Sequence, residues 1–162
     1  MPTSKNDLKE QFEAVEDLLT RWLKERRALL GKYTEIVVTL DQRSDDESLQ
    51  LKQNALCELL VDYASVGHFE VFHELVNEAE RFGDGSCALA EKLLPDIGAT
   101  TEVMLAYEEK YGDFSGHPEK LKRDLSALGE VLESRFVLED QLIAGLHNRH
   151  RRQVRTPAPR SA

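Results

Sequence analysis

The sequence predicts an all-α fold, a helical bundle in which two long terminal helices flank several shorter ones. Apolar residues recur at steps of three and four through residues 7–40 and again through residues 118–148, which is the spacing of one helix face. Helix-breaking residues are scarce, since no proline lies between Pro2 and Pro95 and no glycine between Gly31 and Gly67. The chain has 162 residues, 41% of them apolar, so it has the size of one domain with its own core.

The first long helix is expected over residues 7–40. Ser4 stands three residues before Asp7, where it can cap the helix start with an acid in the first turn. Gly31 falls inside this helix and allows a kink there. A strand over residues 36–40 is the alternative, because several of those residues are β-branched, but no partner strand is visible elsewhere.

Shorter helices follow a polar loop at residues 41–48. One is expected over residues 47–65, and Gly67-His68 should break it or bend it sharply. The remaining expectations are a helix over 69–82, a turn at 83–86, a short helix that Pro95 stops after Leu94, a helix over 99–111 and a break at 112–118.

The last helix is expected over residues 118–148, with Pro118 in its first turn. The arginine-rich sequence that follows, with two further prolines, predicts a disordered tail. The division is therefore a helical domain over 1–148 and a basic disordered tail over 149–162. Of the net charge of -9, the tail contributes +5 and the body -14. An acidic body repels nucleic acid and favours basic partners, although such a charge is also typical of a plain soluble surface.

Several classes of protein are disfavoured by what the sequence lacks. No apolar run approaches the ~20 residues of a membrane span, and the N-terminus has no apolar signal region. Cys57 and Cys87 do not form a disulfide framework, so we expect reduced thiols and a cytoplasmic protein. The sequence shows no glycine-rich phosphate loop and no hydrolase or metalloprotease motif. We therefore expect no enzyme activity and no cofactor.

One pair has the spacing of metal ligands. Glu70 and His73 form a Glu-x-x-His pair on one helix face, as in carboxylate-bridged di-metal bundles. A second such pair is missing, which favours a solvent-facing pair and no metal, although a helical metal-binding protein is kept as an alternative. His147 and His150 are expected to interact with a helix C-terminus.

Charged and aromatic residues lie within the apolar stripes. Arg21, Trp22 and Arg26 lie on the first helix, and charges interrupt the apolar face of the last. Because a charge near a core is costly unless it is paired, Arg21 or Arg26 should meet an acid such as Asp62, Glu133 or Glu139 across the bundle. Two interpretations stay open: an ion network that fixes helix register, or a polar patch with exposed aromatics that binds another protein.

Three blocks of sequence carry a resemblance to a known family. They are DLLTRWLKER at 17–26, LVDYASVGHFE at 60–70 and EVLESRFVLEDQLI at 130–143. In order and spacing they resemble the Rsd/AlgQ family, the regulators of sigma D, over roughly residues 8–147.

The resemblance implies an all-helical anti-sigma factor. Members of this family bind region 4 of the housekeeping sigma factor, a basic module that reads the -35 promoter element, and so favour alternative sigma factors. It further implies a protein partner rather than nucleic acid or membrane, bound one to one by a monomer. A general helical adaptor for other regulatory proteins is a further alternative. The contact residues implied by the resemblance are Asp62, Ser65, Phe69, Arg21, Trp22 and His68.

Overall fold

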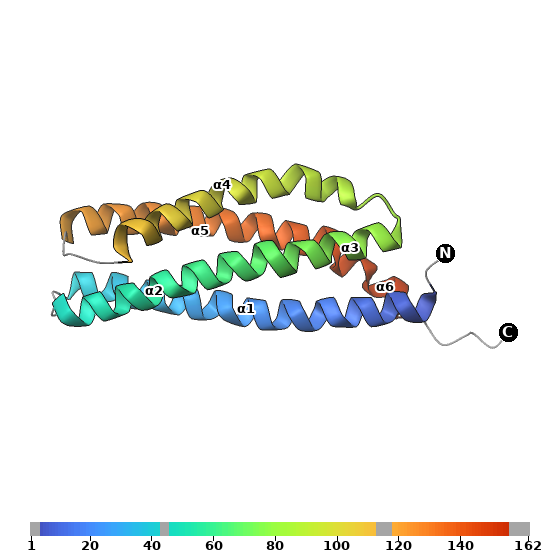
Figure 1. The fold of residues 1–162 in the computed structure, drawn as a ribbon, viewed down its shortest axis with the longest axis horizontal. Helices are drawn as coiled ribbons and strands as arrows, with labels where there is room; N and C mark the ends of the chain where they lie inside the picture. The colour runs from blue at the N-terminus through green and yellow to red at the C-terminus, as the bar shows by residue number, and fades with distance from the viewer. Residues whose placement is uncertain (1–3, 43–45, 113–117, 156–162) are drawn as a thin grey trace.

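A computed structural model describes residues 4–42, 46–112 and 118–155, all side chains included except those at 46, 47, 118 and 119 (Figure 1). The described residues are helical with short turns, and none of them lies in a strand, so the all-α prediction is confirmed. The elements are α1 Lys5–Asp41, α2 Asp46–Val66, the π-helical turn η1 Gly67–Val71, α3 Phe72–Phe82, α4 Cys87–Tyr111, α5 Pro118–Leu146, the 3-10 turn η2 Asn148–His150 and α6 Arg151–Val154.

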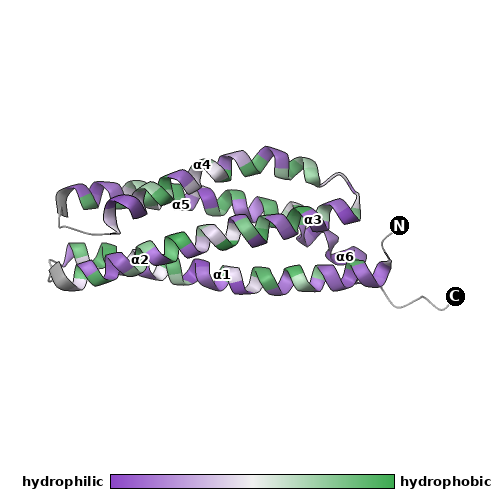
Figure 2. Cartoon of the chain, in the orientation of Figure 1, coloured by the Kyte–Doolittle hydropathy of each residue, from purple (hydrophilic) through white to green (hydrophobic). Residues whose placement is uncertain are grey.

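The long helices run side by side in an elongated bundle (Figure 1). Helix α1 packs along α2, α2 along α4, and α4 along α5, while α5 contacts α1 and α3. Figure 2 shows apolar and polar residues mixed along every helix, as expected where each helix turns one stripe inward. The long terminal helices predicted from the sequence are α1 and α5, with 37 and 29 residues.

Helix α1 forms as the sequence predicts. The Ser4 hydroxyl accepts a hydrogen bond from the Asp7 backbone N–H at 3.1 Å, which satisfies one of the free donors at the helix start. The helix continues through Gly31 and through residues 36–40, so neither a break nor the alternative strand forms. The apolar stripe of α1 faces the core, where Leu29 and Ile36 are fully buried.

Helix α4 corrects the prediction that Pro95 stops a helix. Pro95 lies inside α4, which runs unbroken from Cys87 to Tyr111. A proline in a helix leaves the carbonyl four residues earlier without its hydrogen bond, and here that residue is Glu91. Both Pro95 and Glu91 are exposed, so water can satisfy that carbonyl and the cost of the proline is reduced.

The C-terminal segment corrects the prediction of a disordered tail that begins at Arg149. Residues 148–154 form η2 and α6, and α6 packs against α1 (Figure 1). Residues 156–162, which the same prediction includes, lie outside the described residues. Two histidines that we expected at a helix C-terminus, His147 and His150, are instead fully buried against carboxylates.

These two histidines belong to what we call the end network: Glu16, Glu78, Asp84, His147 and His150. Glu78, fully buried in α3, places one carboxylate oxygen 2.7 Å from His147 Nδ1 and the other 2.6 Å from His150 Nδ1. The remaining ring nitrogens face Glu16 and Asp84, each at 2.9 Å. The end network therefore ties the C-terminal segment to α1, to α3 and to the turn before α4.

Candidate functional site

The segment predicted to carry the site contains an irregular turn. The chain stays helical from α2 into α3, so the break expected at Gly67-His68 is replaced by the π-helical turn η1. Its mark is a hydrogen bond from the Phe72 N–H to the Gly67 carbonyl, five residues back. A π-helical turn fits one extra residue into a helix, and such turns often occur at functional sites.

This turn presents an aromatic side chain to solvent. Phe69 is 72% exposed, the largest exposed fraction among the large apolar side chains that the structure describes. The His68 ring, also exposed, meets it edge to face with 4.8 Å between ring centroids. Val71 and Phe72, the next apolar residues along the chain, are both buried. A single exposed phenylalanine beside a buried apolar pair is a candidate anchor for a partner.

The other predicted contact residues divide between surface and core. Asp62 and Arg21 are exposed and Ser65 is half-buried. Trp22, in contrast, is 1% exposed, which corrects its interpretation as a direct contact. Its indole stacks on Tyr63 at 4.6 Å and donates from Nε1 to the Tyr63 carbonyl at 3.1 Å. Trp22 is therefore part of the support beneath the surface.

Two acidic side chains, Asp62 and Glu70, lie close to Glu25 near the π-helical turn. Glu25 lies on α1, Asp62 on α2 and Glu70 beside Phe69 in η1. Partial burial, together with the negative charges of Asp62 and Glu70, raises the pKa of Glu25, and Arg21 only partly counters this effect. We call Glu25, Asp62, Ser65, Phe69 and Glu70 the acidic patch. Sequence reasoning missed Glu25 in this role and considered Glu70 only as a metal ligand.

A network of charges crosses the bundle below the acidic patch. The Arg26 guanidinium donates to Glu139 at 3.0 Å and to Asp140 at 2.7 Å, and its Nε donates to the Tyr63 hydroxyl at 3.1 Å. The Tyr63 hydroxyl in turn donates to Glu139 at 2.5 Å. The expected pairing of Arg26 with Glu139 is confirmed. We call Arg26, Tyr63, Arg135 and Glu139 the central network.

Arg135 is the unexpected member of the central network. It is fully buried and bonds Glu139, one turn ahead on α5, at 2.8 Å from Nε. Its Nη1 donates to the hydroxyls of Thr100 and Thr101 on α4. The spacing of four residues between Arg135 and Glu139 was a signal for this pair in the sequence.

The protonation states of the central network follow from burial and charge. Burial raises the pKa of Glu139, and the nearby Arg135, Tyr63 and Arg26 counter part of that effect. Burial, followed by the charge of Glu139, raises the pKa of Tyr63, so its hydroxyl keeps the proton that it donates. Burial opposes the charge on Arg26, but the contacts with Tyr63, Asp140 and Glu139 outweigh burial and raise its pKa. Arginine stays charged in any case.

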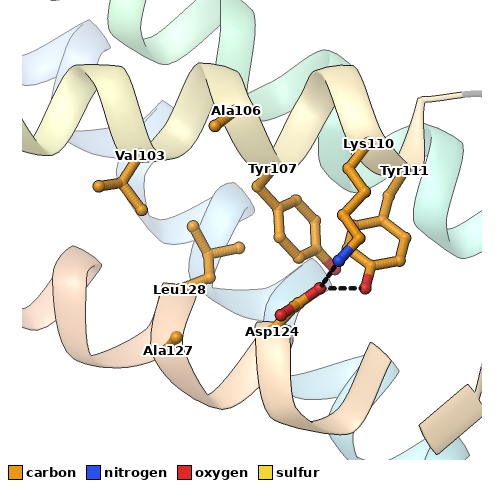
Figure 3. A pocket seen from close by; sticks show the side chains of 8 residues that line it. All are labelled: Val103, Ala106, Tyr107, Lys110, Tyr111, Asp124, Ala127 and Leu128. Atoms are coloured by element: carbon orange, nitrogen blue, oxygen red, sulfur yellow. Dashed lines mark hydrogen bonds and ion pairs between the residues drawn. The ribbon is translucent and has the colours of Figure 1, made fainter. Parts of the chain in front are cut away.

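A separate pocket of about 210 Å³ lies between the C-terminal part of α4 and the N-terminal part of α5 (Figure 3). Apolar side chains such as Val103 and Leu128 line it, and Asp124 stands at one side with Lys110 at 2.5 Å and the Tyr111 hydroxyl. Those two contacts lower the pKa of Asp124 to about 2. The pocket holds none of the residues in the three blocks of resemblance.

Metal binding receives no support from the geometry. Across residues 4–42, 46–112 and 118–155, no group of three or more His, Cys, Asp or Glu side chains could hold a metal ion. Glu70 and His73 are both exposed, as expected for a solvent-facing pair. Among the described helices, none is long and apolar enough to cross a membrane.

Fold and site together define an all-helical bundle protein with an exposed aromatic in an acidic patch, supported by a buried ion network. A family model described as "Regulator of RNA polymerase sigma(70) subunit, Rsd/AlgQ" matches residues 1–147. The chain belongs to the Rsd/AlgQ family, as the three blocks of resemblance indicate.

Curated relatives agree with this assignment. Proteins named "Regulator of sigma D" from Shigella boydii serotype 4 (strain Sb227), Escherichia coli O1:K1 / APEC and Escherichia coli (strain K12 / DH10B) are each 35% identical to this chain over 144 residues. These matches cover 85% of this chain and 89% of each relative. No solved structure matches the chain significantly.

Proposed function

We propose that this protein is an anti-sigma factor that binds region 4 of the housekeeping sigma subunit through the acidic patch. It acts in the cytoplasm, as a monomer that binds one sigma subunit, without catalysis and without touching nucleic acid itself. Occupation of region 4 would reduce its use at -35 promoter elements and favour alternative sigma factors. Membership of the Rsd/AlgQ family supports a regulatory role that acts on a sigma subunit, and the acidic patch supports the choice of this surface as the binding site.

One observation carries the choice of surface: Phe69 is 72% exposed and is followed in the chain by Glu70, which lies close to Glu25. Exposed aromatics at the centre of a polar rim are typical of binding hot spots. Partial burial raises the pKa of Glu25, and the negative charges of Asp62 and Glu70 add to that effect. A basic partner would relieve that repulsion, and a module that binds DNA is basic.

Binding to a purified, fluorescently labelled fragment of sigma region 4 tests the proposal. We expect Phe69→Ala to weaken binding about tenfold or more, because it removes the anchor. We expect Asp62→Ala to weaken binding about fivefold, with a smaller effect at high salt, where charges are screened. Neither change should alter helicity, because both side chains are exposed.

Matched controls come from the same chain. Leu51→Ala removes an apolar side chain that is 68% exposed elsewhere on α2, and Asp41→Ala removes an exposed acid at the far end of α1. Both should bind as the unaltered protein does. Equal affinity of the Phe69 and Asp62 variants with these controls would exclude the acidic patch as the sigma-binding surface. If the fragment does not bind at all while other regulatory proteins do, the helical adaptor is the better description.

A further inference from the structure

The π-helical turn and the buried tryptophan meet at one point. Gly67 is buried, and a Cβ added to it would lie 2.9 Å from Trp22 Cζ2 and 3.3 Å from Phe72 Cζ. Contacts as short as 2.9 Å are not tolerated between carbon atoms, so any larger residue at this position must move something. The indole has little freedom to move, because it is stacked on Tyr63 and meets Phe72 edge to face.

The same contact determines where Phe69 leaves the bundle. Gly67 is the first residue of η1 and supplies the carbonyl that accepts from Phe72, so Phe69 lies inside the widened turn. Each residue of a helix turns about 100° from the last, and one extra residue therefore changes the direction of every side chain in the turn. A displacement of the Gly67 backbone therefore also displaces Phe69, which is two peptide bonds away.

We propose that Gly67 and Trp22 are positioning residues for Phe69: the indole, packed against the glycine, holds the π-helical turn that points Phe69 into the acidic patch. Trp22 thus serves the binding surface although it is buried below it. This inference rests on the proposed function, because it concerns the affinity for sigma region 4. The close packing of α1 against η1 thereby has a role in binding that the exposed residues alone do not explain.

A double-mutant cycle distinguishes positioning from general stability. We expect Gly67→Ala to weaken binding of the labelled region 4 fragment about fivefold or more. In a Phe69→Ala background the same change should cost less than about twofold, because a residue that acts through Phe69 has nothing left to position. Gly31→Ala is the control, since a Cβ there meets nothing within 4 Å, and it should leave binding unchanged.

Space made on the opposite side should reduce the cost of Gly67→Ala. Trp22→Phe replaces the indole by a smaller ring, so Gly67→Ala should cost less than about twofold when combined with it. Trp22 is the single tryptophan of the chain, so its emission reports whether the indole moves in the Gly67→Ala variant. Unchanged affinity of Gly67→Ala, or an equal loss with and without Phe69, would overturn the positioning role.

If circular dichroism shows that the Gly67→Ala variant does not fold, Trp22→Phe takes its place in the double-mutant cycle with Phe69→Ala. A positioning role then predicts that Trp22→Phe weakens binding of the region 4 fragment when Phe69 is present and does not weaken it in the Phe69→Ala background. If Phe69→Ala alone leaves affinity unchanged, the proposed binding surface is wrong. If Phe69→Ala weakens binding but Gly67→Ala does not, only the positioning role is wrong.

Discussion

The central network and the end network both bury carboxylates with cations, but they use different cations. Below the acidic patch, Glu139 is held by Arg26 and Arg135, whose guanidinium groups do not lose their protons in the range of protein stability. At the end of the bundle, Glu78 is held by the rings of His147 and His150. The cations of the central network are thus arginines of fixed charge, and the cations of the end network are supplied by histidine rings.

Counting donors shows what the end network requires. A neutral histidine ring has one N–H, yet both nitrogens of His147 and of His150 lie within 2.9 Å of a carboxylate oxygen. Burial would raise the pKa of Glu16, but hydrogen bonds from His147 and Arg151 outweigh it and lower the pKa, so Glu16 is an acceptor. A protonated Glu78 could donate to only one of the two rings. The geometry is satisfied when both rings are imidazolium ions.

Ring stacking agrees with charged histidines. His147 stacks on Phe12 at 4.1 Å between centroids, and His150 stacks on Phe82 at 4.0 Å. A cation over an aromatic face is favourable, most of all when it is shielded from water. The two networks therefore bury their carboxylates against different groups, guanidinium groups in the central network and imidazole rings stacked on phenylalanines in the end network.

The largest expected effect is on the central network. Glu139→Ala leaves Arg26 and Arg135 without their shared carboxylate in the core, and we expect the free energy of unfolding to fall by about 3–5 kcal/mol. Urea unfolding followed by circular dichroism at neutral pH measures this loss.

Glu133→Ala is the control, because Glu133 is exposed on the same helix and should cost less than about 0.5 kcal/mol. A loss below about 1 kcal/mol for Glu139→Ala would mean that Arg135 finds other partners.

Much of the fold was available from the sequence, because apolar spacing reports which face of a helix is buried. The apolar spacing through residues 118–148 predicts one inner stripe, and Leu125, Leu128 and Leu132, which follow that spacing, are all buried. Pro95 misled the prediction, since whether a proline ends a helix depends on whether water can reach the carbonyl it frees. The π-helical turn was also missed, because Gly67 is read as a break unless the packing of Trp22 against it is known.

The site was predictable where a charge interrupts an apolar stripe of a predicted helix, and not where the partner lies in a segment that has no such stripe. Arg26 and Glu139 were paired across the bundle because a buried charge needs a partner. The end network was missed although Glu78 lies among apolar residues of α3, which was a signal that this acid is buried and needs donors. Its partners lie 69 and 72 residues away, His147 at the end of the predicted last helix and His150 in the segment predicted to be a disordered tail.

The second expected effect is on the end network. Glu78→Gln replaces the acceptor that both rings share by an amide, and we expect the free energy of unfolding to fall by about 2–3 kcal/mol. Urea unfolding followed by circular dichroism measures this loss.

Glu80→Gln, exposed on the same helix, is the control for Glu78→Gln and should cost less than about 0.5 kcal/mol. Nitrogen NMR of the histidine rings gives a direct check, since both nitrogens of His147 and His150 should carry protons at about pH 6. A single protonated nitrogen on each ring would contradict the donor count, and the two networks would then not differ in the way proposed.

The smallest expected effect is on the acid side of the end network. Burial would raise the pKa of Asp84, but hydrogen bonds from Ser86 and His150 outweigh it and lower the pKa to about 2 from 3.8. A carboxylate with a lowered pKa in the folded state adds stability above its ordinary pKa, and that stability is lost as the pH falls toward the folded value. We expect Asp84→Asn to lower the free energy of unfolding by about 1 kcal/mol at about pH 6, because the side chain is partly exposed, and by almost nothing at about pH 2.

Asp96→Asn, exposed on α4, is the control in the same urea titrations. If the cost of Asp84→Asn stays constant down to about pH 2, the contact with His150 is not what stabilises this carboxylate, and the network ends at Glu78.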